Sequence, residues 1–317
     1  MGYSYNVYLP GLDESVAVGE INTATYRNLI KSLYNKEGDL FLEQLNNIIE
    51  IVAPGILQEQ ITVIDYFILL LSTRMICVSP DLKLTSECPE TKRKIETNIR
   101  IEDLIEKLGK IHCNGKFKKD GINIEFSLIK ARDIPTIYKL DREQEPWYFA
   151  VSSLNCIRTK TNIMRLNKLS FEDRKTIVDS LPVAVSSAMY RSLREFYINL
   201  SKQKLIEIIS PFKDGLLASE LPVNISIESI LAFMKLVFND DLVNIYKLTY
   251  NLVSMAGFDP HFLETVTPAE QSLFWTLHLQ RMHKENEDYN AKENESGTSF
   301  DGKNVSIGKT SPSEFTS

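Results

Sequence analysis

Apolar and polar positions follow two different periods along the chain, and the period changes near residue 80. Before that point the apolar positions fall mostly at helical spacing, as in the run from Tyr26 to Leu33. In residues 94–130 they alternate with polar positions, which is typical of strands with one buried face. The pattern therefore predicts an α+β fold for the first part of the chain.

The two periods assign helices and strands over residues 1–140. Pro10-Gly11 separates two alternating runs, which predicts a β-hairpin over residues 3–21. Helical spacing predicts helices over residues 23–34, 38–52, 63–76 and 101–108. The third of these is apolar almost all round, as a central core helix should be. Alternation predicts strands over residues 82–85, 94–101, 110–117 and 122–130, with turns at Asn114-Gly115 and Asp120-Gly121.

The second part of the chain begins after a charged segment at residues 141–146, which we interpret as a domain boundary. From there the pattern predicts mainly helices. A long helix is predicted from Leu181 to Ile209, and a buried one from Leu242 to Met255. Capping residues at predicted helix starts are Ser170, Ser226 and Thr267.

These patterns divide the chain into three parts. We expect an α+β domain over residues 1–140, a mainly helical domain over residues 141–290 and a polar tail over residues 291–317. The tail cannot bury enough apolar surface to offset the entropy lost on ordering, so we expect it to be flexible and disordered.

The amino-acid composition limits which binding partners and which cellular compartment are expected for the protein. The 317 residues are 43% hydrophobic and 25% charged, and the formal net charge is -6. This acidic balance argues against general binding of nucleic acid, which needs clustered Lys and Arg side chains. The basic cluster of Lys116, Lys118 and Lys119 is more typical of an exposed hairpin turn. No segment has the length and apolar character of a membrane span, and the N-terminus lacks a signal-peptide pattern, so we expect a soluble protein with reduced thiols.

The sequence contains none of the usual motifs for nucleotide binding or for a serine nucleophile. One alternative stays open, a metal-binding or thiol-dependent enzyme that would use Cys88, His112 and Cys113. Cys88 begins half of a zinc turn, in which Thr91 stands where the second thiolate would be. Neighbouring residues on a strand point to opposite faces, so His112 and Cys113 would not converge easily on one ion. We therefore expect no enzyme activity, no metal and no cofactor.

Aromatic residues offer a different kind of site. Trp147, Tyr148 and Phe149 follow the charged segment directly, and Phe274 and Trp275 lie on the last predicted helix. Clustered aromatic side chains often anchor protein interfaces, although the same residues equally well fill the space between two domains. We interpret these five residues as candidate interface residues.

Three stretches of the chain carry a resemblance to a known family. The chain opens with YNVYLPGLDESVAVGEINTATYRNLIKSLYN, continues with TVIDYFILLLSTRMICVSPDLKLTSECPET and then reaches INIEFSLIKARDIPT. In these stretches, and more weakly in residues 230–288, the chain resembles the baseplate hub proteins of T-even-type contractile-tailed bacteriophages. The resemblance covers residues 3–135 best. It departs from some relatives at Thr91, where they complete a Cys-x-x-Cys turn.

The resemblance implies a component of the baseplate hub, or a chaperone-like assembly factor, that works through protein–protein contacts. Its partners would be other baseplate hub proteins, with no nucleic acid and no membrane, and a homo-oligomer stays open. The protein would lie in the host cytoplasm during assembly, and in the virion tail baseplate if it is retained there. The family carries no known catalytic residues, so the resemblance transfers none to this chain.

Overall fold

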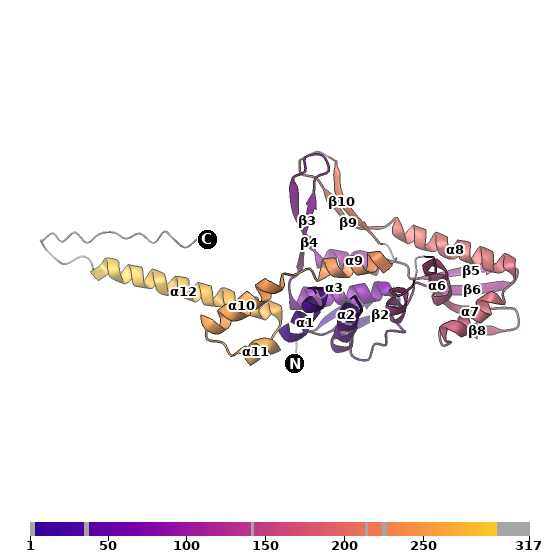
Figure 1. The fold of residues 1–317 in the computed structure, drawn as a ribbon, viewed down its shortest axis with the longest axis horizontal. Helices are drawn as coiled ribbons and strands as arrows, with labels where there is room; N and C mark the ends of the chain where they lie inside the picture. Colours follow the sequence, from indigo (N-terminus) through magenta and orange to yellow (C-terminus); the bar gives the residue numbers. More distant parts are fainter. Residues whose placement is uncertain (1–3, 35–37, 141–142, 213–214, 224–226, 297–317) are drawn as a thin grey trace, which may run out of the picture. The chain divides into compact units, whose positions relative to one another are not determined.

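The structure is a computed structural model that describes residues 4–34, 38–140, 143–212, 215–223 and 227–296 (Figure 1). The chain divides into two compact units, residues 1–272 and residues 273–317. Its strands are β1 (Tyr5–Leu9), β2 (Glu14–Val18), β3 (Asp81–Glu87), β4 (Lys94–Arg100), β5 (Asn114–Lys119), β6 (Ile122–Ser127), β7 (Leu154–Arg158), β8 (Ile163–Arg165), β9 (Lys204–Ile209) and β10 (Leu217–Pro222). Its helices are α1 (Thr23–Tyr34), α2 (Gly38–Val52), α3 (Val63–Cys77), α4 (Ile101–Gly109), η1 (Ala131–Asp133), α5 (Ile134–Ile137), α6 (Glu145–Ser152), α7 (Phe171–Asp179), α8 (Val183–Ser201), α9 (Ile227–Val237), α10 (Leu242–Ser254), α11 (Pro260–Thr265) and α12 (Pro268–Ser296).

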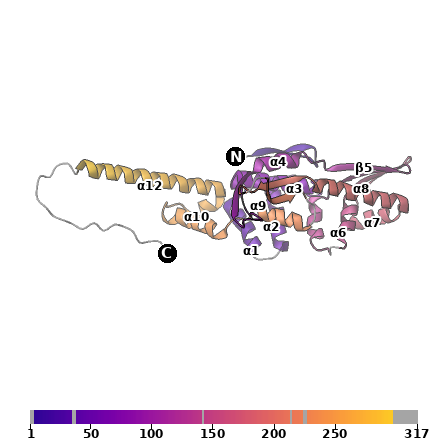
Figure 2. The ribbon, with the colours of Figure 1, turned by 90° about the horizontal axis from the view of Figure 1, so that it is seen from above.

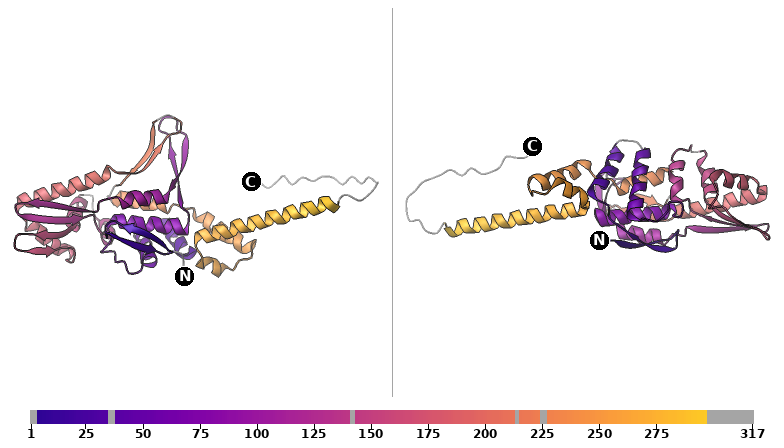
Figure 3. Two further views of the ribbon diagram at one scale, coloured as in Figure 1. Left: turned by 180° about the vertical axis from the view of Figure 1, so that it is seen from behind. Right: turned by 90° about the horizontal axis from the view of Figure 1, so that it is seen from below.

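Helix α3 is the centre of the first unit, because 13 of its 15 residues are buried. Its first turn is closed by a capping box. The Thr62 hydroxyl oxygen accepts a hydrogen bond from the Asp65 backbone N–H, and the Asp65 carboxylate accepts one from the Thr62 N–H at 2.7 Å. Helices α2, α4 and α9 and strands β1 and β2 pack on α3, with α1 beside α2 (Figure 3).

The first hairpin is tied to this central helix at its turn. The backbone N–H of Gly11 donates to Oδ1 of Asp65 at 2.8 Å. A Cβ atom at position 11 would lie 2.1 Å from Oδ2 of the same carboxylate, so only glycine fits there. The predicted hairpin around Pro10-Gly11 is confirmed, and a hydrogen bond ties its turn to α3.

Strands β5 to β8 form an antiparallel four-stranded sheet in the order β5-β6-β7-β8. Helix α8 packs along β5 (Figure 2). A separate group of buried apolar residues, which includes Phe126, Leu154, Leu166 and Met189, fills the space between this sheet and its helices. The sheet combines strands from both sides of residue 140, and a division into domains at that residue stays a prediction.

Two further hairpins, β3-β4 and β9-β10, lie side by side, with β10 against β3 (Figure 1). Leu84 of the first hairpin and Ile206 of the second belong to the same buried core as α3. At the turn of β3-β4, the Ser210 hydroxyl donates to the sulfur of Cys88 at 3.3 Å. Strands β9 and β10 are therefore built into the core that the first helices form.

The predicted fold class is confirmed: an α+β fold, with a mixed strand and helix region followed by a mainly helical one. Helices α1 and α2 have the predicted bounds, and α3 and α4 are each one residue longer than predicted. The turn at Asp120-Gly121 is also confirmed. Both residues have positive φ, 51° and 77°, as the favoured two-residue hairpin turn requires.

Two local predictions are wrong. Asn114-Gly115 is not a turn but the start of β5, which also begins later than the predicted strand. Gly115 is needed there because the Phe126 ring covers it, and a Cβ atom would lie 2.3 Å from that ring. The helix predicted from Leu181 to Ile209 ends at Ser201, and the β-branched residues that follow pair with β10 as a strand.

The prediction that α10 is buried is also wrong. Its helical bounds are nearly as predicted, but Leu252 is its only buried residue. At the C-terminal end, α12 includes residues 291–296 of the predicted polar tail. The rest of that tail, and the predicted cap at Ser226, lie outside the described residues.

Candidate interaction surfaces

The predicted aromatic cluster lies on α6, and two of its three members are turned into the protein. Tyr148 and Phe149 are only 7% and 8% exposed. The ring of Tyr148 stacks on that of Phe171, with centroids 4.4 Å apart and 16° between the planes. Phe149 meets the ring of Tyr197 edge-on at 5.7 Å. The apolar surface of these two residues is therefore used within the chain.

Trp147 is the member of the cluster with surface left for a partner. It is half-buried, and its ring meets that of Phe171 at a centroid distance of 5.5 Å. The Lys175 ammonium lies 5.1 Å from the Trp147 ring centroid, in a cation–π arrangement. Such a pair contributes about 0.5–1 kcal/mol at an exposed site. The role of Trp147 at an interface stays a prediction, as it does for Tyr148 and Phe149.

A buried charged pair lies next to this cluster. Tyr148 donates its hydroxyl hydrogen to Oδ1 of Asp133 at 3.4 Å, and Arg174 donates to the Ser152 carbonyl oxygen at 3.0 Å. Burial raises the pKa of Asp133 and lowers the pKa of Arg174. The opposite charges of Asp133 and Arg174 offset part of the cost of their burial, which fits a structural role.

The alternative site of Cys88, His112 and Cys113 is not assembled. Cys88 lies beside Ser210, whereas Cys113 lies beside Thr62, whose hydroxyl oxygen is 3.8 Å from its sulfur. Over the stretches that the structure describes, no three His, Cys, Asp or Glu side chains lie close enough to hold a metal ion. The structure therefore brings no metal centre together from these residues.

The thiols differ in acidity because their surroundings differ. Burial raises the pKa of Cys77 and of Cys113 to about 12. Hydrogen bonds from Ser210 and Thr91 lower the pKa of Cys88 to about 7. A thiolate needs access to react, and Cys88 is 0% exposed. The Cys88 sulfur thus accepts a hydrogen bond that connects the hairpins β3-β4 and β9-β10.

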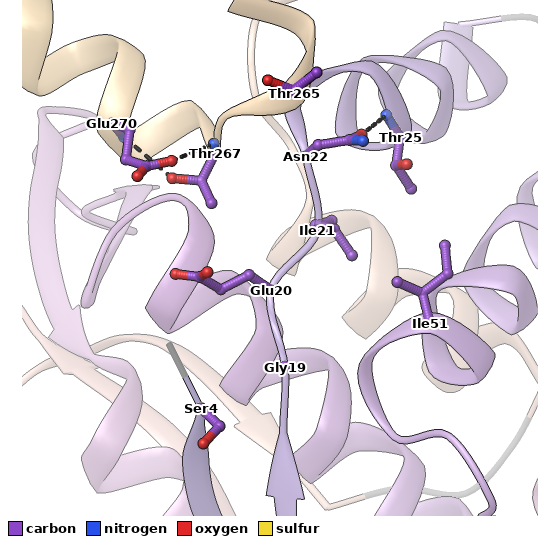
Figure 4. A pocket seen from close by; sticks show the side chains of 10 residues that line it. All are labelled: Ser4, Gly19, Glu20, Ile21, Asn22, Thr25, Ile51, Thr265, Thr267 and Glu270. Carbon is purple, nitrogen blue, oxygen red and sulfur yellow. Dashed lines mark hydrogen bonds between the residues drawn. The ribbon is translucent and has the colours of Figure 1, made fainter. Parts of the chain in front are cut away.

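A pocket of about 500 Å³ lies where the end of β2 meets the starts of α1 and α12 (Figure 4). Its polar groups serve local helix caps. Asn22 accepts a hydrogen bond from the Thr25 N–H at 2.9 Å. Thr267 and Glu270 bond each other's backbone N–H groups at 3.1 and 2.7 Å, so the predicted capping box is confirmed. The lining contains no His, Cys or Lys.

Exposed apolar side chains gather towards the C-terminal end of the chain. Of 20 large apolar side chains that are exposed within the described residues, ten lie between residues 243 and 289. Three of them form one face of α10, at spacings of three and four residues. We call this the tyrosine face, and its members are Val243, Tyr246 and Tyr250, which are 55%, 44% and 69% exposed.

Basic side chains of α1 border the tyrosine face. The Arg27 guanidinium and the Lys31 ammonium lie 5.8 Å and 5.6 Å from the ring centroid of Tyr246. Arg27 also pairs with Glu264 at 2.8 Å. Sequence reasoning missed this face because it placed α10 in the interior. The available signal was the polar residues Asn244 and Lys247, which interrupt the apolar pattern beside the tyrosines.

Phe274 and Trp275 lie on α12 in the second unit. Both are half-buried, and the Trp275 ring stacks on that of His278 with centroids 5.4 Å apart. Their role as interface residues stays a prediction. No helix in the described parts of the chain is at once long and apolar enough to cross a membrane.

Among the described residues, the structure thus shows exposed aromatic side chains on α10 and no group of three side chains placed to hold a metal ion. The sequence model of one protein family, described as T4 bacteriophage base plate protein, matches residues 2–203. This is more than half of the 317 residues, so the chain belongs to this family of bacteriophage base plate proteins. The resemblance found in the sequence is thereby confirmed at the level of the baseplate family. Comparison with curated proteins gave no match, and comparison with solved structures gave none.

Proposed function

We propose that this base plate protein is a component of the baseplate hub, or a factor that assembles the hub, and that it acts through contacts with other hub proteins. The match to the baseplate family over residues 2–203 carries this proposal. A baseplate family favours a structural role, and the proposal is that the protein is not an enzyme. In this proposal it is present in the host cytoplasm during assembly and in the tail baseplate of the virion.

The exposed aromatic surfaces support an action through protein contacts. Tyrosine and tryptophan are enriched among the residues that dominate binding energy at interfaces. The tyrosine face presents Tyr246 and Tyr250 on a helix, which holds them at a fixed spacing. Trp147 is a second candidate anchor, and its ring packs on that of Phe171. Phe274 and Trp275 are proposed as further interface residues.

Two of the three lysines in the basic cluster on β5 have partners within the chain, which supports a protein rather than a nucleic acid as partner. Lys116 lies 3.8 Å from Glu125, a carboxylate that Arg158 also approaches at 3.2 Å. Lys119 donates to the carbonyl oxygen of Ala184 at 3.0 Å. Fewer free cations are then left to release counterions from a phosphate backbone.

Mass spectrometry of purified phage particles, with infected-cell lysate as reference, tests the proposal. Peptides of this chain at a low, fixed ratio to hub proteins would mean a structural hub component. Peptides abundant in lysate but missing from particles would mean an assembly factor that dissociates. Co-expression with all hub proteins is the second arm, and a chain that binds none of them contradicts the proposal.

A further inference from the structure

Helix α12 carries an apolar stripe with the repeat of a coiled coil. Trp275, Leu279, Met282, Asn286 and Tyr289 follow one another at spacings of four, three, four and three residues. At about 100° per residue, the five positions fall within an arc of about 80° on the helix surface. This is the alternation of a and d positions in a heptad repeat, with Asn286 at an a position.

Most side chains of the stripe are exposed to solvent. Leu279, Met282 and Tyr289 are 49%, 44% and 65% exposed, and Trp275 is half-buried. In residues 273–317, α12 is the one element that the structure describes. No other described element of this unit covers the stripe. Apolar side chains at this spacing gain stability when a second helix buries them.

A second row, on the opposite face of α12, does not continue as a seam. It begins with Leu273 and Leu277, but then runs through Gln280, Lys284 and Glu287. The stripe from Trp275 to Tyr289 therefore stays suitable for a partner helix over 15 residues, whereas the row on the opposite face becomes polar after one turn. We therefore expect a partner helix along the stripe from Trp275 to Tyr289 and not along the row that begins with Leu273.

We propose that α12 pairs with α12 of a second copy of this chain, parallel and in register along residues 275–289. Asn286 indicates that the partner helix is a second copy of α12. An asparagine at an a position is satisfied by the same residue of a parallel partner, and it favours a two-stranded coiled coil. Against an apolar helix face its amide would be left unpaired, which costs about 1–3 kcal/mol. A second copy in register supplies the matching amide and repeats the apolar layers on both sides of it.

Disulfide cross-linking of the full-length chain tests this pairing. Met282→Cys places a thiol at a d position, where the two copies face each other, whereas Gln280→Cys places one on the polar row. The four native cysteines are all free and buried, so they compete little. Under mild oxidation we expect covalent dimers of Met282→Cys to form at least about tenfold faster than those of Gln280→Cys. Equal rates, or no dimer from Met282→Cys, would overturn the proposal.

Sedimentation equilibrium gives an independent measurement. Between about 1 µM and 1 mM, a range that covers weak to moderate affinity, the wild-type chain should pass from monomer towards dimer. Met282→Glu should stay monomeric with an unchanged melting temperature, which separates lost pairing from lost folding. A wild-type chain that is monomeric throughout, or that forms trimers, contradicts the proposal. Since no hub protein is present in either experiment, a negative result leaves the proposed hub function standing.

Discussion

Helices α3 and α10 are both rich in apolar residues, yet the fold uses them in opposite ways. In α3, 13 of 15 residues are buried, whereas in α10 only Leu252 of 13 residues is buried. Elements pack on α3 from several sides, whereas α10 has α1 and α11 as its main neighbours. Apolar content alone therefore does not determine whether the residues of a helix are buried. The number of elements that reach a helix decides which of its side chains remain available to partners.

The two helices also differ in their relation to the family. Helix α3 lies inside the matched residues 2–203, and α10 lies beyond them. The end of the match is not the end of the fold, because α9 packs on α3 with the rings of Phe67 and Phe233 4.6 Å apart. Just before α10, Asp240 accepts a hydrogen bond from Arg74 of α3 at 3.2 Å. Helix α9, which follows the matched residues, thus completes the core on which α10 rests.

Truncation after Gln203 is the change with the largest expected effect. It removes nine buried residues of the core, which are Leu205, Ile206, Ile208, Val223, Ile230, Phe233, Met234, Val237 and Phe238. Each large side chain lost from a core costs about 2–5 kcal/mol, so the sum exceeds a typical stability of about 5–15 kcal/mol. We expect no cooperative thermal transition by circular dichroism. A chain that ends at residue 290 is the control and should melt as the full chain does. A cooperative melt of residues 1–203 near the full-length temperature would show that α9 is dispensable.

Phe67→Ala tests the buried helix at a single position. Phe67 is 4% exposed, so its removal should lower the free energy of unfolding by about 3–5 kcal/mol, measured by urea denaturation. Phe233→Ala and the double variant complete a cycle. The two rings should couple by about 0.5–1.5 kcal/mol because they contact each other. Strictly additive losses would mean that the contact between α3 and α9 contributes nothing beyond burial.

Helix α3 also makes the stability of the protein depend on pH, through a buried carboxyl group. Burial raises the pKa of Asp65 on α3, so the folded state holds this proton more tightly than the unfolded state does. Stability from this group is then greatest at acidic pH. It falls as pH rises from the ordinary aspartate value of about 3.9 through the higher folded-state pKa.

Asp65→Asn removes this titration and is the variant that measures it. The variant also weakens the cap at Thr62, which costs about 0.5–2 kcal/mol. Its deficit in unfolding free energy, measured by urea denaturation, should be larger near pH 3 than near pH 7, because the wild-type chain gains from protonation and the variant does not. A deficit that is the same at both pH values would contradict the raised pKa.

Features set by neighbouring residues could be predicted from the sequence, and features set by distant ones could not. The turn at Asp120-Gly121 depends on two residues with positive φ, so the dipeptide is enough. Gly115 has its role from Phe126 on the adjacent strand, and β9 is a strand because β10 pairs with it across a loop. The same distinction applies to the candidate surfaces. Trp147 is found by composition, but the tyrosine face appears only when the neighbours of α10 are known.

Tyr250→Ala should have the smallest effect on stability and the clearest effect on binding. Tyr250 is 69% exposed, so its removal should change the unfolding free energy by no more than about 0.5 kcal/mol, in contrast to Phe67→Ala. If the tyrosine face binds a baseplate protein, the loss of an anchor costs more than about 1 kcal/mol, which is roughly a fivefold or greater rise in Kd.

Asn244→Ala, an exposed change off this face, is the matched control for titration calorimetry with each purified partner. Unchanged affinity for every partner, together with weaker binding by Trp147→Ala, would move the interface from α10 to α6. Loss of folding in Tyr250→Ala would instead contradict the contrast between α3 and α10, because an exposed ring cannot hold the core together.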